Sequence, residues 1–240
     1  MNILILGYGK MGKIISRIAE KRGHHIVAKI NIENVGDLKS LETKTVDVAI
    51  EFSQPESAYG NITWCLNHHI PVVVGTTGWM DKLADIESIC HRKNGTFFYA
   101  SNFSIGVNVF FKVNQYLAKL MGDQEEYQIK VGEIHHTEKK DAPSGTAITL
   151  AEGIIENIKR LRQWKLEDGE ILENDVLPIR SKRVDPAPGT HIVSYQSTID
   201  DIEIKHTAHS REGFAMGAVL VAEWVKDKKG VLTMNDFLDF

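Results

Sequence analysis

The side chains best suited to chemistry lie in one short stretch, residues 133–147, which reads Glu-Ile-His-His-Thr-Glu-Lys-Lys-Asp-Ala-Pro-Ser-Gly-Thr-Ala. Four groups that are cationic or can become so fall within six residues: His135, His136, Lys139 and Lys140. An alternating apolar run at 127–131 precedes them, and residues 143–146 have the composition of a helix start. Helix starts bind anions through backbone amides, and imidazole and ammonium groups both bind anions and transfer protons. We therefore expect a site for a small molecule with more than one carboxylate or phosphate.

The two histidines and the two lysines leave alternatives open. Adjacent residues of a strand point to opposite faces, so His135 and His136 are poorly placed to bind one metal ion, and we predict no metal here. One of the imidazoles could simply be a packed core side chain. Lys139 and Lys140 compete for a single catalytic position, and the lysine that is not held there should be solvated.

A glycine-rich turn near the N-terminus predicts a dinucleotide site. Residues 2–6 form an apolar run typical of a buried parallel strand, residues 14–19 repeat at helical spacing, and residues 25–30 form a second strand. In this strand–turn–helix–strand context the pattern G-x-G-x-x-G binds a pyrophosphate. The residues of the turn are Gly7, Tyr8, Gly9, Lys10, Met11 and Gly12. The pattern alone leaves open a tight turn without a ligand.

The end of the second strand determines which nicotinamide cofactor can bind. An acidic residue there holds the ribose 2′-hydroxyl of NADH and repels the 2′-phosphate of NADPH. This chain has Asn31 at that position. Since Asn31 repels neither group, we expect NADH or NADPH as the cofactor.

Strands and helices alternate through the first part of the chain, which predicts a Rossmann-like, doubly wound parallel sheet. Further strands are expected at 46–52, 71–75 and 96–100, with helices at 55–67 and 79–93 between them. Ligands of such sheets bind beyond the carboxyl ends of the strands. The residues expected there are Phe52, Gly75, Thr76, Thr77, Ala100, Ser101, Asn102 and Phe103.

After residue 105 the pattern changes. The expected elements are helices at 107–121 and 144–161 and strands at 127–136, 176–183, 191–197 and 202–206. Successive strands without intervening helices favour an open, mixed or antiparallel sheet. Residues 162–174 are polar and charged and carry no predicted element. The tail is expected to be all helical, with helices at 213–225 and 233–238.

Two domains follow from this change of pattern. The first is a dinucleotide-binding domain of residues 1–104, completed by residues 213–240. The second is an α+β domain of residues 105–212 for substrate binding and oligomerisation.

Composition excludes several classes of partner. The chain has 240 residues, a formal net charge of -4 and 25% charged residues, which argues against a nucleic-acid or acidic-membrane binder. No apolar run approaches the ~20 residues of a membrane span, and no export signal precedes the first strand. Cys65 and Cys90 lie far apart and form no metal-ligand spacing. We expect a cytoplasmic protein with reduced cysteines in its core.

Residues 133–147 closely resemble the signature E-x-H-H-x-x-K-x-D-A-P-S-G-T-A of the 4-hydroxy-tetrahydrodipicolinate reductase (dihydrodipicolinate reductase) family, which acts in the diaminopimelate route to lysine. Further segments that resemble the family occur in the family's order: residues 7–12, 75–78, 101–108, 188–191 and 210–218. The resemblance therefore covers nearly the whole chain. The string His-His…Lys…Asp-Ala-Pro-Ser-Gly-Thr is highly specific, whereas the glycine turn alone is not.

The resemblance implies reduction of a cyclic dicarboxylate with NADH or NADPH, with loss of water from a hydroxylated ring. It implies that His135 is the catalytic acid/base and that Lys139 donates a proton to the ring carbon beside the one receiving hydride. The substrate carboxylates would be held by His136, Gly145 and Thr146. The family is usually homotetrameric through the sheet of the second domain. The chain departs from the family at Asn31, where an acid is common, and at Thr190, where the family usually has Glu.

Two other functions remain open on the sequence. One is a different two-domain dehydrogenase for a carboxylated substrate, such as an aspartate- or homoserine-type enzyme, which would not require adjacent histidines with Lys139. The other is a non-catalytic NAD(P)-binding sensor, which would keep the glycine turn and need no proton donor.

Overall fold

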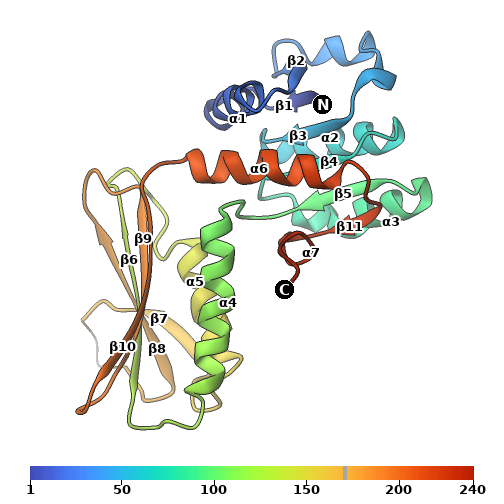
Figure 1. Ribbon diagram of the computed structural model, residues 1–240. Helices are drawn as coiled ribbons and strands as arrows, with labels where there is room; N and C mark the ends of the chain where they lie inside the picture. The colour runs from blue at the N-terminus through green and yellow to red at the C-terminus, as the bar shows by residue number, and fades with distance from the viewer. Residues whose placement is uncertain (170–171) are drawn as a thin grey trace. The chain divides into compact units, whose positions relative to one another are not determined.

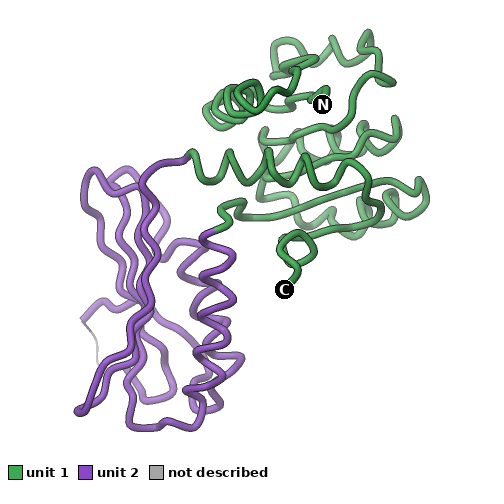
Figure 2. The backbone as a smooth tube through the Cα atoms, in the orientation of Figure 1, with its two compact units in different colours: residues 1–105, 212–240 green, residues 106–211 purple. Residues whose placement is uncertain are grey.

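The computed structural model describes residues 1–169 and 172–240 (Figure 1). The described chain divides into two compact units, coloured separately in Figure 2. Unit 1 consists of residues 1–105 and 212–240, and unit 2 consists of residues 106–211. Unit 2 is thus an insertion in the sequence of unit 1.

Unit 1 is built on a parallel sheet with the strand order β11-β5-β4-β3-β1-β2. The strands are β1 (Asn2–Leu6), β2 (His25–Ile30), β3 (Val48–Glu51), β4 (Val72–Val74), β5 (Thr96–Tyr99) and β11 (Gly230–Leu232). The direction of winding reverses between β1 and β3, and ligands of such sheets bind at this switch point. The central strands are buried along their length because helices cover both faces.

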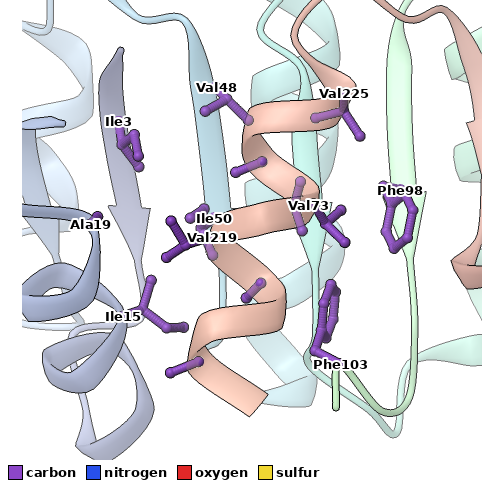
Figure 3. Close-up of a cluster of buried hydrophobic side chains, with 14 of the residues drawn as sticks. Ile3, Ile15, Ala19, Val48, Ile50, Val73, Phe98, Phe103, Val219 and Val225 are labelled. Atoms are coloured by element: carbon purple, nitrogen blue, oxygen red, sulfur yellow. The ribbon is translucent and has the colours of Figure 1, made fainter. Parts of the chain in front are cut away.

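Helices α1 (Lys10–Lys21) and α6 (Glu212–Val225) pack on one face of this sheet, and α2 (Pro55–Asn67) and α3 (Leu83–Lys93) pack on the other. Figure 3 shows the first layer, in which Val219 of α6 lies over Ile50 of β3. The short helix α7 (Met234–Leu238) adds Met234 to the same layer. Because α6 and α7 follow unit 2 in the sequence, the C-terminal segment completes the core of unit 1.

In unit 2, the helices α4 (Ile105–Leu120) and α5 (Gly145–Ile155) pack against one face of a mixed sheet (Figure 1). The strand order is β10-β9-β6-β8-β7, with β6 parallel to β8 and antiparallel to β9. The strands are β6 (Gln128–His135), β7 (Gln163–Leu166), β8 (Val176–Arg183), β9 (Gly189–Gln196) and β10 (Asp201–Ala208). Side chains such as Phe110, Leu150 and Tyr195 fill the layer between helices and sheet. The central strand β6 leads directly into the His-His-Lys stretch.

The fold class expected from the sequence is confirmed: a Rossmann-like parallel sheet and a second, mixed sheet. Some elements differ from expectation. Strand β7 lies in the charged stretch predicted to have no element, and strand β11 interrupts the tail predicted to be all helical. Helix α5 ends at Ile155 instead of continuing to residue 161. Just beyond that end, the Asn157 side chain donates a hydrogen bond to the Gly153 carbonyl at 2.9 Å, a local bond of the kind that competes with helix propagation.

Candidate active site

Strand β6 places two titratable groups on one face of the sheet of unit 2. Its residues alternate between buried and more exposed, with Glu133 and His135 both on the buried face beneath α5. Their side chains are 0% and 9% exposed. His136 lies just past the strand and is half-buried. The adjacent histidines are therefore in different surroundings, as strand geometry requires.

Helix α5 begins beside this strand. Ser144 is its N-cap, and its hydroxyl accepts a hydrogen bond from the Ala147 amide at 3.2 Å. Gly145 and Thr146 form the first helical turn, which contains no acidic residue. A Cβ added at Gly145 would meet no atom within 4 Å, so the helix start is open to a small ligand. This arrangement suits a carboxylate, because helix starts direct amide N–H groups and a partial positive charge outward.

The loop between β6 and α5 carries both lysines, and the structure distinguishes them. Lys139 Nζ donates to both carboxylate oxygens of Asp141, at 2.8 Å and 2.7 Å, and its side chain is 22% exposed. Lys140 is exposed. Of the two candidates for a catalytic lysine, Lys139 is therefore the one whose ammonium group is held.

A hydrogen-bonded cluster that the sequence analysis did not anticipate lies behind His135. The buried Glu133 carboxylate accepts from the Ser144 amide at 3.1 Å and from Ser181 Oγ at 2.7 Å. Glu133 Oε2 also lies 3.4 Å from His135 Nδ1 and 3.7 Å from His191 Nε2. His191 belongs to β9 and stacks edge-on against His135, with ring centroids 5.0 Å apart.

Burial and hydrogen bonding together set the ionisation of this cluster. Burial lowers the pKa of His135, with the Glu133 carboxylate opposing that shift and the Lys139 ammonium adding to it. Burial likewise lowers the pKa of His191, to about 4. Burial alone would raise the pKa of Glu133, but hydrogen bonds from Ser144 and Ser181 hold it below its usual range. At neutral pH the cluster thus contains an ionised carboxylate between two neutral imidazoles.

The ligand atoms of Glu133, His135 and His191 lie within 4.8 Å of one another, a grouping that could hold a metal ion. The Glu133 carboxylate, however, already accepts hydrogen bonds from Ser144 and Ser181 and faces the Arg183 guanidinium at 3.3 Å. A cation at this place would have to compete with those donors. We interpret Glu133 as the acceptor of a hydrogen-bonded network with Ser144, Ser181 and Arg183, against which the two imidazoles pack.

In unit 1, a cavity of about 330 Å³ lies beyond the carboxyl ends of β1, β2 and β3. The predicted cofactor residues that line it are Gly7, Tyr8, Gly9, Asn31 and Phe52. Polar residues that the sequence analysis did not name also line it: Ser53, Gln54, Ser57 and Asn61. Ser53 could have been found, since it follows β3 almost directly, but Ser57 and Asn61 belong to α2 and gave no local signal.

Close approaches explain two of the three glycines of the turn. Gly7 has φ of +94°, and a Cβ there would lie 2.0 Å from the Phe52 carbonyl oxygen. A Cβ at Gly12 would lie 2.2 Å from the Gly7 carbonyl oxygen. At Gly9 nothing lies within 4 Å, so this position leaves space at the start of α1. That start has no side-chain cap and no acidic residue in its first turn, which suits a pyrophosphate.

Phe52 lies between the glycine-rich turn and the predicted cofactor loops that contain Gly75 and Phe103. A Cβ at Gly75 would lie 2.2 Å from the Phe52 ring, whose centroid is 5.4 Å from that of Phe103. Nearby, the Ser53 amide donates to Thr76 Oγ1 at 2.8 Å. The remaining predicted cofactor residues are not among those lining the cavity: Lys10, Met11, Gly12, Gly75, Thr76, Thr77, Ala100, Ser101, Asn102 and Phe103.

The Asn31 side chain is used within its own turn. Its Oδ1 accepts hydrogen bonds from the amides of Glu33 at 2.8 Å and Asn34 at 3.2 Å. Lys29, also near this strand end, lies with Nζ 5.2 Å from the centroid of the Tyr8 ring. Position 31 therefore offers no carboxylate to repel a 2′-phosphate.

Known proteins resemble both units. Family models for the N-terminus and C-terminus of dihydrodipicolinate reductase match residues 1–103 and 106–238. The 4-hydroxy-tetrahydrodipicolinate reductase of Christiangramia forsetii is 52% identical over 240 residues, covering 99% of this chain and 98% of that protein. That of Methanosarcina barkeri is 33% identical, covering 99% of each.

A solved structure, a dipicolinate-bound dihydrodipicolinate reductase from Paenisporosarcina sp. TG-14, has the same fold, with a TM-score of 0.80, 22% identity and 99% of each chain covered. The resemblance noted from the sequence motifs is confirmed by these matches. The chain therefore belongs to the dihydrodipicolinate reductase family and is an oxidoreductase that uses NADH or NADPH.

Proposed function

We propose that this chain reduces 4-hydroxy-tetrahydrodipicolinate to tetrahydrodipicolinate, with loss of water, in the diaminopimelate route to lysine. Unit 1 binds NADH or NADPH and unit 2 binds the dicarboxylate. Family membership supports the reaction. The observation that carries the division of roles is the cluster in unit 2, where a buried imidazole, a held ammonium group and an open helix start lie on consecutive segments.

The residues of unit 1 fit a dinucleotide. The start of α1 with Gly9 receives the pyrophosphate, and Asn31 lies at the ribose end of the same cavity. The loops around Phe52, Gly75, Thr76 and Phe103 flank the nicotinamide end. When bound, the nicotinamide supplies the hydride.

In unit 2, the two carboxylates of the substrate meet an imidazole and a set of backbone amides. His136 and the first turn of α5, at Gly145 and Thr146, hold them. The relative solved with dipicolinate, a cyclic dicarboxylate, supports this class of ligand. Anions are stabilised at a helix start by its amides and by the helix dipole.

Lys139 and His135 carry the proton chemistry. The Asp141 carboxylate holds the Lys139 ammonium in place, from which a proton passes to the ring carbon beside the one receiving hydride. His135 is neutral at neutral pH because burial lowers its pKa, so it can accept a proton as the acid/base partner. The negative charge of a bound dicarboxylate favours the protonated form of His135 and so couples proton transfer to substrate binding.

We also propose a cytoplasmic homotetramer assembled through the sheet of unit 2. Within unit 2, α4 and α5 cover one face of this sheet, and the opposite face has a shallow hollow of about 200 Å³. Half-buried apolar side chains, including Ile134, Pro178 and Ile192, line it, and charged residues such as Lys130, Glu167 and Arg180 line it as well. A second copy would bury these apolar side chains.

A reducing compartment is consistent with Cys65 and Cys90, which are both free and buried. In the described part of the chain, no helix has the length and apolar character needed to cross a bilayer.

The test is to follow NADH and NADPH oxidation side by side with freshly generated 4-hydroxy-tetrahydrodipicolinate. We expect turnover with at least one cofactor, and the ratio of the two rates measures the preference that Asn31 leaves open. Cofactor binding without oxidation would support the sensor function instead. Oxidation with a different carboxylated substrate alone would support the other dehydrogenase.

A further inference from the structure

Arg183 connects the end of β8 to the loop that carries Lys139. It lies beside His135 in the parallel β6–β8 register, and its side chain is 21% exposed. Its Nη2 donates to the Asp141 carbonyl at 2.6 Å, and its Nε donates to the Lys139 carbonyl at 3.3 Å. Both Nη atoms also lie 3.3 Å from Glu133 Oε1. One guanidinium thus bridges the buried carboxylate and two backbone carbonyls of the loop.

Glu133 holds the far end of the same loop. Its fully buried carboxylate accepts from the Ser144 amide, where the loop turns into α5. At the near end, Asp185 accepts from the Thr137 amide at 3.0 Å and from the Thr137 hydroxyl at 2.6 Å. The loop is therefore fixed at its start by Asp185, at its middle by Arg183 and at its end by Glu133.

We propose that Glu133 and Arg183 form a positioning pair that fixes loop 136–144 so that Lys139 is presented in one orientation beside His135. The inference rests on the proposed function for the roles of Lys139 and His135. Arg183 holds the carbonyl of Lys139 itself, so a shift of the guanidinium moves the backbone from which the ammonium extends. A planar fork with several donors can meet three acceptors at once, which a lysine in its place cannot do.

The same pair sets the charge around His135. The groups that face this cluster are Glu133 on β6, Lys139 and Asp141 on the loop, Arg183 on β8, His191 on β9 and His206 on β10. After burial, which is the main cause, the positive charges of Lys139 and Arg183 help to lower the pKa of His135. Removal of the Arg183 charge therefore raises that pKa, and the acidic limb of the pH–rate profile moves to higher pH.

Two variants separate geometry from charge. Arg183→Lys keeps the charge but cannot span Glu133 and the two loop carbonyls, whereas Arg183→Met loses both. We expect both variants to lower kcat by about 10- to 100-fold, with a smaller change in KM, as for a catalytic group displaced by ~1 Å. The acidic limb should move only in Arg183→Met. Arg162→Met, whose wild-type side chain is 81% exposed, is the matched control and should behave as wild type.

Hydrogen exchange of the backbone amides of residues 136–142 and 144 tests the pair without any turnover. It should accelerate in both Arg183 variants while exchange in β6 and β9 stays as in wild type. This measurement remains decisive if the wild-type chain fails to reduce the dicarboxylate, an outcome that would count only against the proposed function. If Arg183→Met does not fold, Arg183→Lys alone decides. The proposal is overturned by unchanged loop exchange in a folded variant, by wild-type turnover with a loosened loop, or by exchange that accelerates throughout unit 2.

Discussion

His191 is a buried imidazole that the fold keeps neutral. It lies 3.1 Å from Ser144 Oγ, which caps α5, and it faces the Glu133 carboxylate from β9. Burial lowers its pKa to about 4, against ~6.5 for an unfolded histidine. Between these values the unfolded state binds a proton that the folded state does not. The free energy of unfolding must therefore fall as the pH drops from the upper value to the lower one.

We predict that His191 contributes a fall of about 2 kcal/mol in the free energy of unfolding between about pH 7.5 and about pH 5. The variant His191→Gln should largely lack this contribution. Urea denaturation at the two pH values measures it. His25→Gln, at an exposed position at the start of β2, serves as the control and should lose as much stability as wild type. An equal loss in wild type and His191→Gln would show that other groups govern the acid sensitivity.

Lys139 and Lys140 are adjacent in sequence but differ in surroundings. The first is held by Asp141, and the second is exposed. Lys139→Met should lower kcat by about 10²- to 10⁴-fold, the usual effect of losing a general acid, while the affinity for NADH or NADPH stays unchanged. Lys140→Met should remain close to wild type. Steady-state kinetics and cofactor fluorescence titration give both quantities, and similar losses in the two variants would contradict the assignment.

At the scale of elements, the turn between β1 and α1 contains glycines with two different roles. Gly7→Ala places a side chain at a positive φ and against the Phe52 carbonyl, whereas Gly9→Ala meets nothing in the protein. We expect Gly7→Ala to destabilise unit 1 by about 1–3 kcal/mol for the strained backbone conformation, and by more if the clash with Phe52 is not relieved. Gly9→Ala should melt as wild type but bind the cofactor more weakly. Thermal unfolding and fluorescence titration distinguish these effects, with Gly36→Ala, also free of contacts, as the control.

Elements whose signals are local could be predicted from the sequence. Apolar runs with a glycine turn between them identified β1, α1 and β2, and Pro55 marked the start of α2. Strand β7 escaped prediction because only alternate side chains of this edge strand are half-buried. Strand β11 is too short to show a period, and it is held by pairing with β5.

The candidate site likewise has one part that could be predicted from the sequence and one part that could not. The His-His-Lys stretch and the Ser144 cap are contiguous and could be identified from residue types. The partnership of Glu133 with His191 and Arg183 could not, because it depends on strand register across about fifty residues of chain. Which strands pair, and in which register, depends on how the buried faces of all five strands pack, so residues 133–147 alone do not reveal these partners.

At the scale of the whole molecule, the face of the unit 2 sheet opposite α4 and α5 is the proposed assembly surface. Ile192 of β9 lies on it, opposite Gly132 of β6. Ile192→Glu would place a charge where the proposed partner copy packs, so we predict dissociation of a tetramer into smaller species. Sedimentation velocity measures this, with Ile199→Glu, at a position 84% exposed, as the control. A wild-type chain that sediments as a monomer would contradict the assembly.

The insertion of unit 2 within unit 1 has a consequence for synthesis on the ribosome. Residues 106–211 emerge complete before α6, whose Ala218, Val219 and Val221 belong to the core of unit 1. The nucleotide-binding unit, although it begins first, must therefore wait until residues 212–240 have been made, while the inserted unit can fold before then. A fragment of residues 1–211 should accordingly show a protease-resistant core from unit 2 and rapid cleavage within residues 1–105. During synthesis, chaperones would then be needed mainly by the strands of residues 1–105, which stay unfolded until α6 has been made.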